Sequence, residues 1–142
     1  MNKVYLLDTN IVSEFSKERP NQNVIALYEA RKKMCAISAV TWQELIYGVS
    51  KMPEGKRKDS ISEFTEDLKN NFEIIPYDEF SANICGQLLG ICAKCGKTLP
   101  YGDTQIAATA IANGMVLVTR NASDFAEAKE RSFLKVEDWF SA

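Results

Sequence analysis

Apolar residues along this chain alternate between short runs typical of buried strands and longer segments with the spacing of amphipathic helices. Strands are predicted at residues 3–7, 35–37, 72–75, 115–119 and 134–136. Helices are predicted at residues 11–16, 21–33, 39–51, 59–70, 80–95, 104–113 and 124–129. Ser38 precedes the third of these helices, where its side chain is expected to act as an N-cap.

This alternation predicts an α/β fold in which a mainly parallel central sheet is covered by helices on both faces. The pattern shows no repeat and no low-complexity tract, so we expect a single domain over residues 1–142. In open sheets of this kind, ligands bind in the crevice beyond the carboxyl ends of the strands. Polar residues that directly follow a predicted strand are therefore the first candidates for function.

Composition narrows the range of functions. The apolar run before Asp8 is too short for a secretory leader or a membrane span, so we expect a cytoplasmic protein without membrane association. In that setting the cysteines are expected to be buried thiols, and the C-x-x-C spacing of Cys92 and Cys95 fits helix packing better than a zinc site. A net charge of -2 implies that any nucleic acid is bound through local basic patches.

The chain contains no histidine. This absence excludes ribonucleases with paired imidazoles, Ser-His-Asp hydrolases, Cys-His proteases and zinc sites with histidine ligands. Acid-base or metal chemistry in this protein must therefore rest on carboxylates.

Carboxylates occur where predicted strands and helices meet at one edge of the sheet. They are Asp8 at the end of the first strand, Glu44 one turn into the helix after the second strand, Asp103 at the start of the alanine-rich helix, and Asp124 after the strand 115–119. Taken singly, each aspartate is more typical of a helix cap and the glutamate of a solvated helix face. Clustered carboxylates repel one another unless a cation lies between them, and all-oxygen ligands favour Mg2+ or Mn2+.

Several segments together carry a resemblance to a known family. They are LLDTNI, MCAISAVTWQELIYG, GDTQIAATA, LVTRNASDF and VEDW, in this order between Val4 and Trp139. In this order and spacing they make the chain resemble a PIN-domain ribonuclease of the VapC toxin type. The resemblance implies a PIN-like three-layer α/β/α sandwich, an endoribonuclease dependent on Mg2+ or Mn2+, a homodimer, and a VapB-like antitoxin whose tail blocks the acidic site. It also makes transfer RNA a candidate substrate.

Carried over residue by residue, the resemblance assigns Asp8, Glu44 and Asp103 to catalytic positions, with Asp8 and Asp103 holding the metal ion. For the fourth position we prefer Asp124, while some relatives place an acid where this chain has Asn121. Glu44 and Asp124 would hold a second ion or orient the attacking water. Supporting hydrogen bonds to the carboxylates or the phosphate are expected from four polar residues, each of which also fits a turn or cap: Thr9, Asn10, Thr119 and Asn121.

A basic rim would allow an acidic cleft to attract RNA. Lys97 and Arg120 are the candidates because both precede acidic positions at the same sheet edge, although such residues are also typical of a solvated surface. Two other functions stay open: a PIN-fold module that binds RNA or protein without cleavage and, less favoured, an Asp-nucleophile phosphatase of the haloacid dehalogenase kind. The phosphatase needs a second aspartate two positions after Asp8, where this chain has Asn10.

Overall fold

The computed structural model describes residues 2–141, and at its centre lies a sheet of five parallel strands. The strands are β1 (Tyr5–Leu7), β2 (Cys35–Ser38), β3 (Glu73–Ile75), β4 (Val116–Val118) and β5 (Lys135–Glu137). Their spatial order is β3-β2-β1-β4-β5. The chain therefore builds the sheet in one direction from the central strand β1 and then in the other, so the topology switches between β1 and β4.

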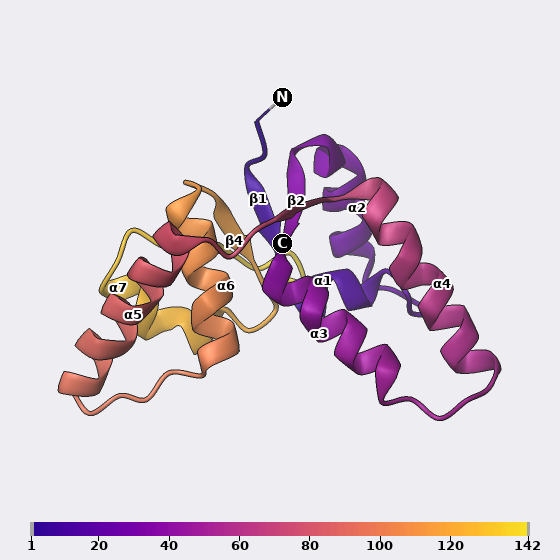
Figure 1. Cartoon of the computed structure of the whole chain (residues 1–142). Helices are drawn as coiled ribbons and strands as arrows, with labels where there is room; N and C mark the ends of the chain where they lie inside the picture. Colours follow the sequence, from indigo (N-terminus) through magenta and orange to yellow (C-terminus); the bar gives the residue numbers. More distant parts are fainter. Residues whose placement is uncertain (1, 142) are drawn as a thin grey trace.

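Helices cover both faces of this sheet. They are α1 (Thr9–Glu14), α2 (Gln22–Arg31), α3 (Ala39–Ser50), α4 (Lys56–Asn71), α5 (Glu79–Lys94), α6 (Tyr101–Ala112) and α7 (Ala126–Glu130), with short 3-10 segments at Lys32–Met34 and Ala122–Phe125. Figure 1 shows α1 to α4 on one side of the strands and α5, α6 and α7 on the other. The predicted α/β/α sandwich with a parallel sheet is confirmed.

The pleat of the central strand divides the core in two. Leu6 and Leu7 are both fully buried, but successive strand residues point to opposite faces. Leu6 packs in the cluster that contains Ile106 of α6, whereas Leu7 packs in the cluster that contains Ile11 of α1. Because both faces of the sheet are covered, every residue of β1 is apolar or aromatic. The first polar residue can therefore occur only after the carboxyl end of the strand.

Each predicted strand and helix is present, with shifted ends. Ser38 is the N-cap of α3, as expected, and its hydroxyl accepts a hydrogen bond of 2.9 Å from the backbone N–H of Thr41. The alanine-rich helix α6 begins at Tyr101 and not at residue 104, because Pro100 has the extended backbone that precedes a helix. Asp103 is consequently inside the first turn of α6 rather than before it.

The cysteines are free thiols, and Cys35, Cys85 and Cys92 are buried, as predicted. The prediction was wrong for Cys95, which is exposed because it lies at the end of α5, beyond the packed face of the helix. Burial raises the pKa of the Cys35 thiol to about 12, so this group stays protonated and acts as a small apolar side chain. Within residues 2–141, no helix combines the length and the apolar character needed to cross a membrane.

Candidate active site

Asp8 lies at the topological switch point, directly after β1. Its backbone N–H donates to the carbonyl of Val118 in β4 at 2.8 Å, and its own carbonyl accepts from the N–H groups of Ile11 and Val12. The side chain is 5% exposed, and its Oδ1 atom accepts from the backbone N–H of Thr9 at 2.8 Å. Asp8 is thus the N-cap of α1 and at the same time a carboxylate in the crevice between β1 and β4.

A network of hydroxyl and amide groups fixes the second oxygen of Asp8. The hydroxyl of Thr119, at the end of β4, donates to Asp8 Oδ2 at 2.8 Å, and the Asn10 side-chain amide donates to the Thr119 hydroxyl at 3.2 Å. Asn10 Oδ1 in turn accepts from the backbone N–H of Arg120 at 3.1 Å. The side-chain amide of Asn10 therefore joins the end of β4 to α1, and the second aspartate that the phosphatase alternative needs at this position is absent.

Glu44 reaches the same crevice from α3. Its Oε1 atom accepts a short hydrogen bond from the Thr9 hydroxyl, and that hydroxyl also lies 3.4 Å from the Thr41 hydroxyl. Its Oε2 atom is close to α6, where a Cβ on Gly102 would approach it to 3.3 Å. Thr9 thus links the carboxylates of Asp8 and Glu44, since its backbone binds one and its side chain binds the other.

A cleft of about 400 Å³ brings these groups together. Its lining residues come from α1 and the residues next to it, from α3, from α6 and from the segment after β4: Asp8, Thr9, Asn10, Ser13, Glu14, Lys17, Glu44, Asp103, Arg120 and Asn121. The structure therefore unites Asp8, Glu44 and Asp103, three acidic residues that are far apart in the sequence. The position of the carboxylates along the chain predicted that these three lie together, but it also predicted Asp124, which is not among the lining residues.

The electrostatics of the cleft agree with a concentration of negative charge. Burial raises the pKa of Asp8 above its ordinary value; hydrogen bonds from Thr119 and Thr9 oppose this shift, and the charges of Asp103 and Glu44 add to it. Burial also raises the pKa of Asp103, and the charge of Asp124 raises it further. Asp8 and Asp103 thus carry their charge at a cost that a neighbouring cation would offset.

This donor set suits a divalent metal ion by its chemistry. Asp8, Glu44 and Asp103 offer hard oxygen atoms of the kind that Mg2+ and Mn2+ prefer. Within the described part of the chain, no group of three or more Asp, Glu, Cys or His side chains lies close enough together to hold a metal ion as the side chains stand, although these three carboxylates line one cleft. The hydroxyls of Thr119 and Thr9 each hold one carboxylate oxygen, while lone pairs on those oxygens stay free for a ligand.

Two predicted residues stand apart from the cleft lining. One of them is Asp124, which is exposed in the 3-10 segment after β4, where its charge raises the pKa of Asp103. Asn121, the other candidate for the fourth position, does line the cleft, and its backbone N–H donates to the Thr119 hydroxyl at 3.1 Å. Lys97 lies just beyond α5 with its backbone N–H bound to the carbonyl of Cys92, and it is not among the lining residues, whereas Arg120 is.

Three lining residues were not expected from the sequence: Ser13, Glu14 and Lys17. Gly102, which lies next to Glu44, is outside the predicted helix 104–113 but inside the observed α6. The α1 residues would have been found by placing them on a helix that starts at Thr9, since positions one turn apart share a face.

Comparison with known proteins agrees with this architecture. Residues 5–131 match the family model of the PIN domain. The tRNA(fMet)-specific endonuclease VapC of Shigella flexneri is 31% identical over 135 residues, which cover 95% of this chain and 97% of that protein. The crystal structure of FitAcB from Neisseria gonorrhoeae has a TM-score of 0.87 and 31% identity, with coverage of 98% of this chain and 100% of that chain. A toxin-antitoxin complex from Klebsiella pneumoniae has a TM-score of 0.67 and 29% identity, with coverage of 86% of this chain and 90% of that chain.

The parallel sheet and the acidic cleft at its switch point define an α/β domain with a carboxylate-based site, and the chain belongs to the PIN-domain family. Its similarity to VapC proteins extends over almost its whole length. The resemblance that the five sequence segments suggested is thus confirmed.

Proposed function

We propose that this chain acts as a single-domain endoribonuclease toxin that hydrolyses RNA phosphodiester bonds with the help of Mg2+ or Mn2+. The observation that carries the proposal is the convergence of Asp8, Glu44 and Asp103 in one open cleft. Helix capping accounts for Asp8 alone, because Glu44 lies in the middle of α3 and Asp103 follows the N-cap of α6 by three positions.

The residues of the cleft would have different roles in the reaction. Asp8 and Asp103 would hold the metal ion, which supplies a charge that makes water more acidic and stabilises negative charge on the phosphoryl oxygens. Thr119 and the Thr9 backbone keep Asp8 in one orientation. The Thr9 hydroxyl holds one oxygen of Glu44, which leaves its other oxygen to orient the attacking water. No step needs a histidine.

Substrate and partners are proposed from the relatives. The Shigella protein is a tRNA(fMet)-specific endonuclease, so transfer RNA is the first substrate to test. The Klebsiella protein is part of a toxin-antitoxin complex, which supports a VapB-like antitoxin as partner here. We further propose a homodimer that works in the cytoplasm, where RNA is available.

The test compares wild-type protein, free of antitoxin, with Asp8→Asn on total cellular RNA in the presence of Mg2+, Mn2+ or EDTA, followed by sequencing of the new 5' ends. We expect cuts that depend on metal and that fall at least roughly 100-fold in the variant. Asp67→Asn, an exposed aspartate on α4, is the matched control and should cut like wild type.

The runner-up is a PIN-fold module that binds RNA or protein without cleavage. It gains support if wild-type protein binds RNA but leaves it intact with both metals, because the acidic residues would then serve only structure or binding. Cleavage that persists in EDTA would contradict the metal dependence but would still support a nuclease function.

A further inference from the structure

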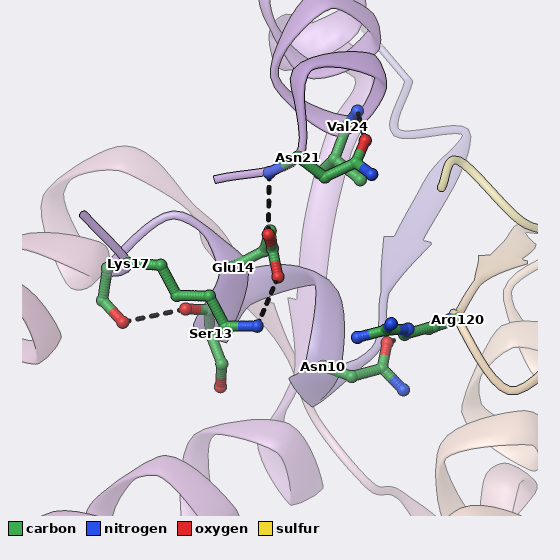
Figure 2. Close-up of polar contacts among 8 residues, drawn as sticks. Asn10, Ser13, Glu14, Lys17, Asn21, Val24 and Arg120 are labelled. Atoms are coloured by element: carbon green, nitrogen blue, oxygen red, sulfur yellow. Dashed lines mark hydrogen bonds and ion pairs between the residues drawn. The ribbon is translucent and has the colours of Figure 1, made fainter. Parts of the chain in front are cut away.

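Glu14, the last residue of α1, is a buried carboxylate with two assigned partners. Its side chain is 5% exposed, and Oε2 accepts from the backbone N–H of Asn21 at 2.7 Å. Its Oε1 atom lies 2.8 Å from the Nζ atom of Lys17. Figure 2 shows both contacts, with the ammonium end of Lys17 turned back toward Glu14. A buried carboxylate without such partners would be strongly unfavourable, so Glu14 and Lys17 form one unit.

Hydrogen bonds fix the chain between α1 and α2 on both sides of the Glu14–Lys17 pair. Asn21 is the N-cap of α2, and its Oδ1 atom accepts from the N–H groups of Asn23 at 2.9 Å and Val24 at 3.2 Å. The backbone N–H of Lys17 donates to the carbonyl of Glu14 at 3.2 Å. Lys17 is therefore fixed at its backbone and at its amine, unlike an ordinary surface lysine.

The fixed ammonium group borders the acidic cleft. Lys17 and Ser13 line it together with Asp8, Glu44 and Asp103. A lysine ammonium has three donors, and here it forms an ion pair with Glu14 on one side. The Lys17 side chain is 53% exposed, so the other donors can meet a ligand that enters from solvent.

Arg120 is a second cation in the same lining. Its guanidinium carbon lies 4.7 Å from the centre of the Phe140 ring, and its backbone is bound to Asn10. The charge of Arg120 also contributes to lowering the pKa of Glu14, after the larger effect of the hydrogen bond from Lys17. Both cations therefore act on the same region of the cleft, and Figure 2 shows Arg120 beside Asn10 on α1.

We propose that Lys17 and Arg120 form a phosphate-binding subsite for RNA, next to the acidic residues, and that Glu14 positions Lys17 for it. This inference rests on the proposed ribonuclease function and adds the contact that holds a phosphate beside the one that is cut. Three carboxylates repel a polyanion, so an enzyme of this kind needs fixed cations at the entrance to the cleft. Because Glu14 is buried, Lys17 also stabilises the fold, so its role in RNA binding is measured by KM and by the salt dependence and not by stability.

The kinetic test uses an RNA oligonucleotide that contains a mapped cut site. Lys17→Gln should raise KM roughly fivefold, the upper range for one exposed ionic contact, and leave kcat within about twofold. The slope of log(kcat/KM) against log[salt] should become shallower by about 0.7, as expected for one lost contact to single-stranded RNA. Lys17→Arg keeps the charge and should restore most of the affinity.

A second substrate locates the contact. Replacing single phosphates near the cut with neutral methylphosphonates should weaken wild-type binding at one position and leave Lys17→Gln unaffected at that position. Glu14→Gln should raise KM in the same direction as Lys17→Gln, because the ammonium group is no longer held. Lys33→Gln, an exposed lysine before β2 at the opposite edge of the sheet, is the control and should behave like wild type.

Binding of the oligonucleotide in EDTA at low salt separates this inference from the proposed function. Loss of binding in Lys17→Gln without any cleavage by wild type would contradict the ribonuclease and support the subsite. Equal binding and equal salt slopes in wild type and Lys17→Gln, measured below the melting temperature of both proteins, would overturn the subsite even if the wild type cuts RNA.

Discussion

Gly102 in the first turn of α6 lies directly against the carboxylate of Glu44 in α3, so that a Cβ at this position would stand 3.3 Å from Oε2. The backbone of Gly102 does not have the positive φ that is found at Gly55, Gly96 and Gly114. Space, and not conformational freedom, is therefore what this position supplies. This space allows Glu44 to reach the cleft beside Asp103, which lies in the same turn of α6 as Gly102.

Gly102→Ala is expected to stabilise the fold and weaken the enzyme. Alanine favours a helix over glycine by up to about 1 kcal/mol, so thermal stability should rise. The added methyl group should push Glu44 by a few tenths of an ångström and lower kcat roughly tenfold. Gly90→Ala in α5 is the control, since a Cβ there meets nothing within 4 Å. Equal activity of both variants would show that the position of Glu44 tolerates the shift.

The Thr9 hydroxyl should matter for catalysis more than for folding. Thr9→Val keeps the shape and the backbone bond to Asp8 but removes the hydrogen bond to Glu44. Loss of a group that orients a metal-site residue typically costs 10- to 100-fold, and we expect a decrease of about tenfold in kcat/KM. Thr9→Ser should recover most of the activity. Full activity of Thr9→Val, measured at the same metal concentration, would remove this role.

Metal ions and pH should act together on stability through Asp103. Its raised pKa means that the folded protein binds this proton more tightly than the unfolded chain, so the ionised group disfavours the metal-free fold at neutral pH. In EDTA at pH 7, Asp103→Asn should therefore melt at a higher temperature than wild type. The difference should shrink as the pH falls through the raised pKa of the folded protein toward the ordinary value near 3.8.

With metal present the order should reverse. Mg2+ or Mn2+ at about 100 times its Kd stabilises the folded wild type by roughly 2.7 kcal/mol, and Asp103→Asn should lose most of that gain. Calorimetric or fluorescence melting with EDTA, Mg2+ and Mn2+ measures both effects. Equal metal-induced shifts in the two proteins would show that Asp103 does not hold the ion.

The fourth acidic position can be assigned by comparing two variants. Asp124→Asn should lower activity roughly tenfold and increase the metal concentration needed for half-maximal rate, because it removes a charge that acts on Asp103. Asn121→Ala should have the smaller effect, since Asn121 binds Thr119 through its backbone. The opposite ranking in a metal titration would assign the position to Asn121.

Periodicity and the strand-end rule were enough to predict the sheet, the helices and the site at Asp8. A strand buried on both faces must be apolar to its end, so the first carboxylate after it marks the crevice. Glu44 and Asp103 could be assigned to the same edge because their helices follow from the same pattern. The family resemblance supplied their roles, which no local rule provides.

Other features depend on contacts that no local pattern records. The helix predicted at residues 104–113 begins at Tyr101 in the structure, three positions earlier. Nothing in the sequence around Glu14 indicates that its carboxylate bonds to Asn21, seven positions later. Lys97 follows a glycine and is bound to the end of α5, so its position in the sequence did not bring it into the cleft lining.

The hydrogen bond from Thr119 to Asp8 joins residues that are 111 positions apart. During synthesis, Asp8 is made long before the hydroxyl that orients it, and a nascent chain that has not yet released β4 from the ribosome cannot form the cleft. A chain that ends before β4 lacks both the hydroxyl that orients Asp8 and the strand that pairs with β1 on that side. The cleft can therefore form only late in synthesis, when most of the chain has already been made.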